Sequence, residues 1–390
     1  MTTPTFLCRS LVCLLCVEAS QALSFKPNCT LPPPGTNYVS APNTRSTLTI
    51  LWSNLSTILL CTWSIQHLNV PAMRPDTDSA LEKMKRSILD FRIKVKWMLL
   101  TILVPEYLVG KAFGERLAAK AGVKAMFALV SERVTWEEVH AYMANMGYFV
   151  LQIDNDTKAQ FKDEVANILG ALTLSNSEKM NMLRFAQPYW ALNNTQWSMI
   201  VGTQADLDFA GLPEVSSEQL QKLDKGGTLV KVLALSQITY LIVQLVARKV
   251  ADLPSTQLEI ATLAFSALSF ATYFLYWNRP QGIETIHIIK ARENPISQFR
   301  SGQGELPSTD DMERLAALGP TYSWLSDHRA KTYGYDGFGP APIPNDAIHL
   351  AGSLPLHDFS HVTGSNDEAF AMAFGTMVGG MLFGGLHYLA

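Results

Sequence analysis

The side chains best suited to chemistry in this sequence are polar residues that recur within long apolar segments. In the segment 228–246 and just after it, Gln237, Tyr240, Gln244 and Arg248 follow helical spacing and would share one face of a helix. Polar groups in an apolar helix are costly unless paired, so they point to function. We expect Gln237 and Tyr240 to act as hydrogen-bond donors in catalysis, and Gln244 and Arg248 to bind a substrate.

A second polar stripe lies in the apolar segment 47–67. Trp52, Ser56, Trp63 and His67 fall within about 60° of one another at 100° per residue. His67 is ionisable near neutral pH and is a candidate catalytic residue. The indoles of Trp52 and Trp63 would form aromatic walls of a binding site.

Two further candidates lie in separate apolar segments. Glu106 is ionisable and follows Pro105, a residue that interrupts helices, so it is a candidate catalytic residue. Tyr273, in the segment 259–277, would add an aromatic wall. All of these residues also have structural interpretations: amides and tyrosines join helices by hydrogen bonds, and aromatic residues line membrane interfaces.

The segments that carry these residues are apolar enough to cross a membrane. Five of them, at 47–67, 95–109, 228–246, 259–277 and 369–389, are apolar for about 15 to 21 residues, and a helix needs about 20 to span a bilayer. The first 22 residues have one arginine, a short apolar stretch and small residues, which is typical of a secretory signal. Three of the five cysteines lie there, so we expect no disulfide framework.

Charge and glycosylation motifs predict the orientation. The loop 68–96 contains seven lysines and arginines and should stay cytoplasmic, with the N-terminal segment lumenal. Asn-x-Ser/Thr motifs at Asn28, Asn155 and Asn193 predict glycosylation, and the last two favour a lumenal side for the segment 111–227. The net charge of −3 indicates no nucleic-acid partner.

Together these patterns predict an all-α, multi-pass integral membrane protein with about four or five transmembrane helices and a helical extramembrane insert. The endoplasmic reticulum is the expected location, and the bilayer and a lipophilic small molecule are the expected partners. The predicted units are a signal peptide 1–22, a lumenal loop 23–44, transmembrane helices 1–2 at 45–110, the insert 111–227, transmembrane helices 3–4 at 228–277, a loop-rich segment 278–368 and a C-terminal transmembrane helix 369–390.

Several common enzyme classes lack their motifs here. The sequence has no phosphate-binding Walker loop, no Gly-rich dinucleotide fingerprint after a strand and no Gly-x-Ser-x-Gly elbow. Asp310 and Asp311 begin a motif that resembles a magnesium-diphosphate site, but Arg314 stands where a last carboxylate is needed. His357 and His361 have metal-like spacing but lie in a Pro/Gly-rich stretch that favours a solvated loop. We therefore expect no metal and no cofactor.

Motifs along most of the chain resemble a large family of fungal multi-span membrane proteins. The matching blocks start at Thr44, Ile50, Cys61, His67, Lys96, Pro105, Trp136, His140, Asp224, Leu253 and Tyr273. Most members have no assigned function, and where a role is proposed they look like enzymes of fungal specialised metabolism. One such role is a membrane-bound Diels–Alderase that forms the norbornene of sordarin-type diterpenes. Members typically continue past the equivalent of Gly384, whereas this chain stops at Ala390.

The resemblance implies a cofactor-independent cyclase, an isomerase-type enzyme of terpenoid biosynthesis that closes a ring by an intramolecular Diels–Alder reaction. Such a reaction needs a shaped apolar cavity and a hydrogen-bond donor or two. The alternatives are a transporter, a receptor or a scaffold that associates with membrane-bound biosynthetic enzymes. A transporter would favour more spans, internal pseudo-symmetry and midplane helix breaks, and the sequence shows one break, at Pro105.

Overall fold

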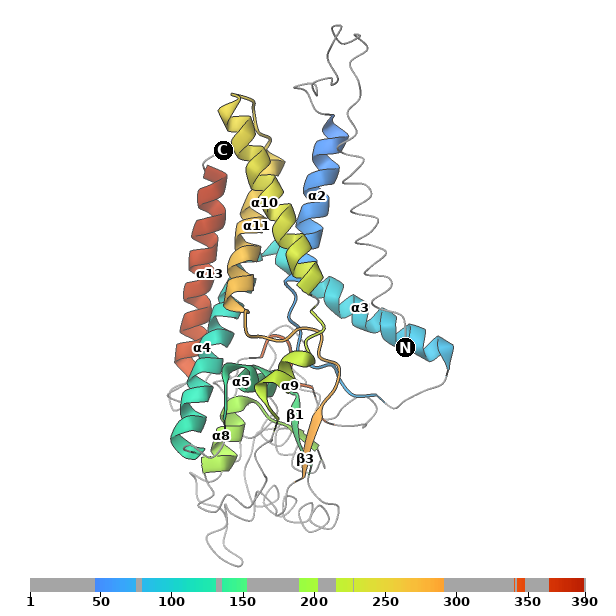
Figure 1. The fold of residues 1–390 in the computed structure, drawn as a ribbon, viewed down its shortest axis with the longest axis vertical. Helices are drawn as coiled ribbons and strands as arrows, with labels where there is room; N and C mark the ends of the chain where they lie inside the picture. The colour runs from blue at the N-terminus through green and yellow to red at the C-terminus, as the bar shows by residue number, and fades with distance from the viewer. Residues whose placement is uncertain are drawn as a thin grey trace, which may run out of the picture.

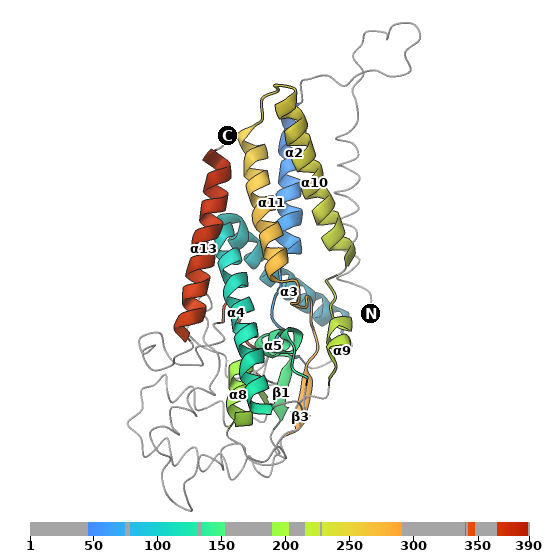
Figure 2. The same ribbon diagram turned by 60° about the vertical axis from the view of Figure 1, so that its left-hand side comes forward.

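The computed structural model describes residues 46–74, 79–130, 135–152, 189–202, 215–226, 228–290, 340, 342–347 and 365–388. Four long helices lie side by side at one end of the molecule (Figures 1 and 2). They are α2 (Thr47–Ser64), α10 (Thr228–Val250), α11 (Gln257–Leu275) and α13 (Ser365–Tyr388). The opposite end contains the short helices α5 (Glu138–Asn145), α8 (Asn194–Gly202) and α9 (Ser217–Lys222) and a small sheet.

Three helices in the described part of the chain are long and apolar enough to cross a membrane: Val232–Val250, Gln257–Leu275 and Phe370–Tyr388. They coincide with three of the five apolar segments. Helix α2 runs beside them and contacts α10 and α11, but it is not among the helices that are both long and apolar enough to cross a membrane. Helix α11 begins at a capping box, in which Thr256 Oγ1 accepts from the Glu259 amide and the Glu259 carboxylate accepts from the Thr256 amide.

The segment 95–109 is not the single helix that its apolar composition predicts. Helix α3 (Ala80–Leu103) ends before Pro105, and α4 (Pro105–Val130) starts there in a new direction. Pro105 cannot continue α3 because its ring and missing N–H break the hydrogen-bond ladder, whereas it fits the first position of a new helix. Figure 1 shows α3 running obliquely away from the four long helices.

Close packing of α4 against α13 joins the two ends of the molecule. Gly110 and Gly114 on α4 face Met372 on α13, and Gly375 lies against Gly110. Gly379 lies against Glu106. Gly375 and Gly379 therefore allow the close helix contact, whereas a Cβ at Gly380 or Gly384 on the same helix would meet nothing within 4 Å.

A three-stranded sheet departs from the predicted all-α fold. Strand β1 (Phe149–Gln152) pairs antiparallel with β2 (Tyr189–Ala191) and parallel with β3 (His287–Lys290). The strands have three or four residues each, too short for alternation to distinguish them from buried helix. The parallel pair ties the segment after α11 to the segment after α5, which are far apart in sequence.

Contacts near the end of α2 bring the start of the basic loop against the described part of the segment 111–227. The amide of Val70 donates to Met146 O at 3.0 Å. The Asn69 amide donates to Asn345 Oδ1 at 2.6 Å.

The burial of Asn193 argues against the glycosylation predicted there. Asn193 is fully buried, and its Oδ1 accepts from the Gln196 amide at 2.9 Å at the start of α8, which leaves no room for a glycan. Asn28 and Asn155 lie outside the described residues, as do the signal segment, Asp310 and His357. We expect Asn193→Gln to leave the glycosidase-induced shift in electrophoretic mobility unchanged. A smaller shift in the variant would contradict the burial.

Candidate functional site

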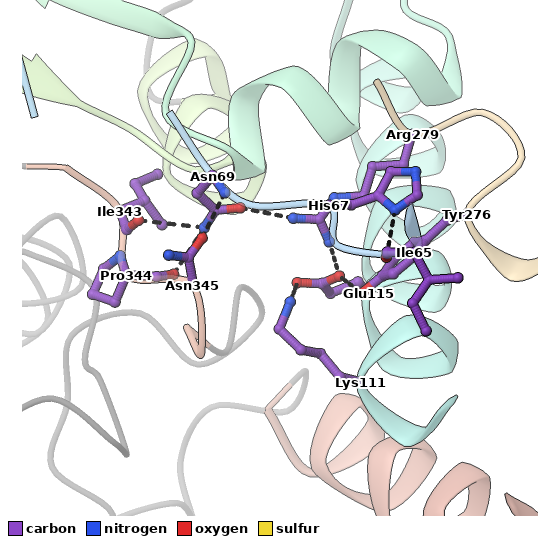
Figure 3. Close-up of polar contacts among 10 residues, drawn as sticks. All are labelled: Ile65, His67, Asn69, Lys111, Glu115, Tyr276, Arg279, Ile343, Pro344 and Asn345. Carbon is purple, nitrogen blue, oxygen red and sulfur yellow. Dashed lines mark hydrogen bonds and ion pairs between the residues drawn. The ribbon is translucent and has the colours of Figure 1, made fainter. Parts of the chain in front are cut away.

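A buried polar cluster lies where α11 ends and α13 begins, between the apolar helices and the rest of the molecule (Figure 3). Its side chains are 2–4% exposed, or slightly more for Asn69. Helix α4 places Lys111 and Glu115 one turn apart on one face. The other members come from the segments after α2 and at the end of α11: His67, Asn69, Tyr276 and Arg279.

Glu115 is the centre of the cluster. Its Oε1 lies 2.5 Å from Lys111 Nζ. Its Oε2 accepts hydrogen bonds from Tyr276 Oη and from Arg279 Nη1. A buried carboxylate is tolerated only when it is paired and its lone pairs are satisfied, and three donors achieve that here.

Arg279 extends the network to distant parts of the chain. Its Nη2 donates to Asn69 Oδ1 at 2.7 Å, and its guanidinium lies 4.8 Å from the centroid of the Tyr276 ring. Asn69 Nδ2 in turn donates to Pro344 O at 2.8 Å and to Ile343 O at 3.3 Å. The cluster thus joins α4, the end of α11, the segment after α2 and residues 342–347.

His67 is the predicted catalytic residue that the structure brings to this cluster. Its ring centroid lies 4.8 Å from that of Tyr276, and its Nδ1 lies 2.9 Å from Ile65 O. That contact favours the tautomer with the proton on Nδ1, because a carbonyl oxygen can only accept. The imidazole therefore packs against the Tyr276 ring beside the charged groups.

Two buried hydrogen-bond donors have no partner among the described residues: Arg279 Nε, in the cluster, and Tyr142 Oη, on α5. Tyr142 is 1% exposed and extends from α5, where it packs with Ala119 of α4. It is close enough to Tyr276 to influence that residue electrostatically. Buried donors are nearly always satisfied in folded proteins, so each of these two indicates a position for an acceptor from outside the chain, such as a water or a ligand oxygen.

Burial also changes the proton affinity of the two cations. It lowers the pKa of Arg279 to about 9, so the guanidinium is still protonated at pH 7. The pKa of Lys111 falls well below its usual range, because the ammonium is buried and because the charge of Arg279 repels it.

The other residues predicted from sequence lie away from the cluster. On α10, Tyr240 is 54% exposed, Gln237 and Gln244 are half-buried, and Arg248 Nη2 donates to Pro254 O in the α10–α11 turn. That stripe faces partly outward, so the structure does not bring it to Glu115.

The remaining predicted residues are spread over four helices. Glu106 lies against Gly379, and Tyr273 is half-buried on α11 near Ser64. Trp52 is 46% exposed, and the Trp63 ring lies 5.7 Å from that of Phe91 of α3, with the two rings tilted. These residues do not form one site with the α10 stripe.

The sequence analysis missed Lys111, Glu115, Tyr142 and Arg279, and Tyr276 was interpreted as an aromatic residue near a membrane interface. The available signal was the i, i+4 pair of opposite charges at Lys111 and Glu115 among small and apolar residues. No such signal marked Arg279 in the sequence, because a charged residue just after an apolar segment is typical of a membrane anchor. In the described part of the chain, no three His, Cys, Asp or Glu residues are placed to hold a metal ion.

Comparison with known proteins places the chain in one family. No curated protein matches it, and no solved structure does. A model for a family of unknown function (DUF8562) matches residues 19–170 and 203–312, well over half of the chain. All of the cluster residues named above lie within the matched ranges. The chain therefore belongs to this family of unknown function, DUF8562.

Proposed function

We propose that this protein is a membrane-bound enzyme that closes a ring in a lipophilic, terpenoid-like molecule without a cofactor, by an intramolecular Diels–Alder reaction. The pair of buried donors without a partner, Arg279 Nε and Tyr142 Oη, is the observation that carries the proposal. The resemblance to enzymes of fungal specialised metabolism supplies the reaction class.

The donors match what this reaction needs from a protein. The ring closure forms two carbon–carbon σ bonds at the expense of two π bonds, and no proton or electron leaves the substrate. An electron-poor alkene reacts faster, so donors placed on a conjugated carbonyl oxygen would lower the barrier. Arg279 is held in place by Glu115 and Asn69, so its Nε can bind an oxygen without reorganising.

The position of the cluster suits a lipid-soluble substrate. It lies at the ends of the apolar helices α11 and α13, where a molecule dissolved in a bilayer would meet the first buried polar groups. Membrane integration, at the endoplasmic reticulum, is therefore part of the proposal. We expect the protein to stay in the pellet when microsomes are washed with alkaline carbonate, and its release into the supernatant would contradict this.

Tyr142→Phe is the sharpest test because it removes one hydroxyl that no described residue binds. Losing an unpaired buried donor does not weaken folding, so thermal stability should be unchanged or higher. Turnover of an aldehyde-bearing cyclopentadiene precursor by microsomes should fall by roughly two orders of magnitude, as for other donors to a reacting oxygen. The amount of cyclised product would be measured by chromatography and compared with the amount formed by microsomes that lack the protein.

Tyr240→Phe is the matched control, because it deletes the same hydroxyl from an exposed position on α10. It should keep full activity, whereas the sequence-based assignment of Tyr240 to catalysis expects a loss. Full activity in Tyr142→Phe, or a product ratio that the protein does not change, would overturn the proposal. Deletion of the gene separates the alternatives: an uncyclised intermediate accumulates for an enzyme, and altered export of normal product indicates transport.

A further inference from the structure

Helix α3 has one face that packs on the rest of the protein. Trp97 and Thr101 are buried there, and Thr101 Oγ1 accepts from Gln66 Nε2 at 2.9 Å. One and two turns earlier, Lys94 lies 5.8 Å from the Trp63 ring and Asp90 pairs with Arg74 at 3.2 Å. These residues follow helical spacing, so this side of α3 is the one that contacts the rest of the protein.

An adjoining face, whose edge residue Phe91 also lies 5.7 Å from the Trp63 ring, carries an exposed apolar stripe. At 100° per residue its members fall within about 80° of one another, and each is more than half exposed. They are Leu81 (66%), Met84 (55%), Ile88 (51%) and Phe91 (56%), which we call the α3 stripe. A row of large apolar side chains in this position indicates a surface that another apolar phase covers.

The charged residues beside the α3 stripe indicate what kind of surface would cover it. Helix α3 has six basic residues and two acidic ones, and one of the acids, Asp90, is already paired with Arg74. Lys85 and Arg92 flank the stripe on one side, whereas Lys83 lies on the side of Lys94 and Asp90. Long basic side chains beside an apolar stripe extend their charges to the level of lipid phosphates while their methylenes stay in the apolar region.

We propose that α3 lies in the surface of a membrane leaflet rich in anionic lipid, with the α3 stripe in the acyl region and its lysines and arginines on the headgroup phosphates. The helix is placed for this, because it runs obliquely to the long apolar helices and continues through Val104 into α4, which packs on α13. The inference rests on the membrane location proposed above but not on the reaction.

The test uses full-length protein in lipid nanodiscs, with its native cysteines replaced by serine. A fluorophore is attached at Ile88→Cys in the α3 stripe or at Arg86→Cys on the opposite face, and doxyl-labelled lipid is the quencher. With phosphatidylserine in the disc, quenching at position 88 should exceed that at position 86 by about twofold or more. The excess should shrink in purely zwitterionic discs and in the variant Lys83→Glu, Lys85→Glu, Arg92→Glu.

Equal quenching at the two positions would overturn the inference. So would a disulfide between two copies through Ile88→Cys within one disc, because the stripe would then face a second copy. Failure of the protein to enter discs at all would instead refute the membrane location. An inactive enzyme that still shows the quenching pattern would refute only the proposed reaction.

Discussion

Glu115→Ala is expected to destabilise the protein by about 3–5 kcal/mol, because it leaves Lys111 and Arg279 buried without their shared counter-ion. It also removes the acceptor of Tyr276 Oη. For a protein of marginal stability this is a large part of the total. Thermal unfolding of the detergent-purified protein, followed by intrinsic fluorescence, measures the loss as a fall of the midpoint or as a failure to yield folded protein.

Glu284→Ala is the matched control. Glu284 also forms an ion pair, with Lys225 at 2.7 Å, but both side chains are more than half exposed. Exposed pairs contribute about 0–1 kcal/mol, so the midpoint should hardly move. Adding Lys111→Met to Glu115→Ala should recover part of the loss, since it removes one of the unpaired cations. Equal effects of Glu115→Ala and Glu284→Ala would contradict the buried network.

Gly110→Ala is expected to force α4 and α13 apart. The added Cβ would lie 2.0 Å from Thr376 Oγ1 and 2.4 Å from Met372 O, and the second of these is backbone that no rotamer change can move. Overpacking of a close helix contact costs about 1–3 kcal/mol and occasionally more. This destabilisation is measured as a fall in the thermal midpoint. It should also appear as a loss of monodisperse protein in size-exclusion chromatography.

Gly384→Ala provides the comparison on α13 itself. A Cβ at Gly384 meets nothing within 4 Å, and alanine favours the helix by up to about 1 kcal/mol over glycine. This variant should therefore match or exceed the parent in stability. A Gly110→Ala protein as stable as Gly384→Ala would show that α4 and α13 do not pack as described.

The sequence alone determined that the protein is mainly helical and where three long apolar helices lie. The segments 228–246, 259–277 and 369–389 coincide with α10, α11 and α13, because each is a continuous apolar run ended by polar or turn residues. It also marked His67 as a candidate catalytic residue, and the structure places it beside the Tyr276 ring.

Only the tertiary structure decided which polar residues meet. Helical periodicity shows which residues share a face of one helix, but not which face another helix covers, so it could not show that Tyr240 is exposed while Tyr276 is buried. Glu115, Arg279 and Asn69 are more than 40 residues apart in sequence and belong to different segments. Their contact depends on where the helices pack, and burial makes it costly to leave any of these charges unpaired.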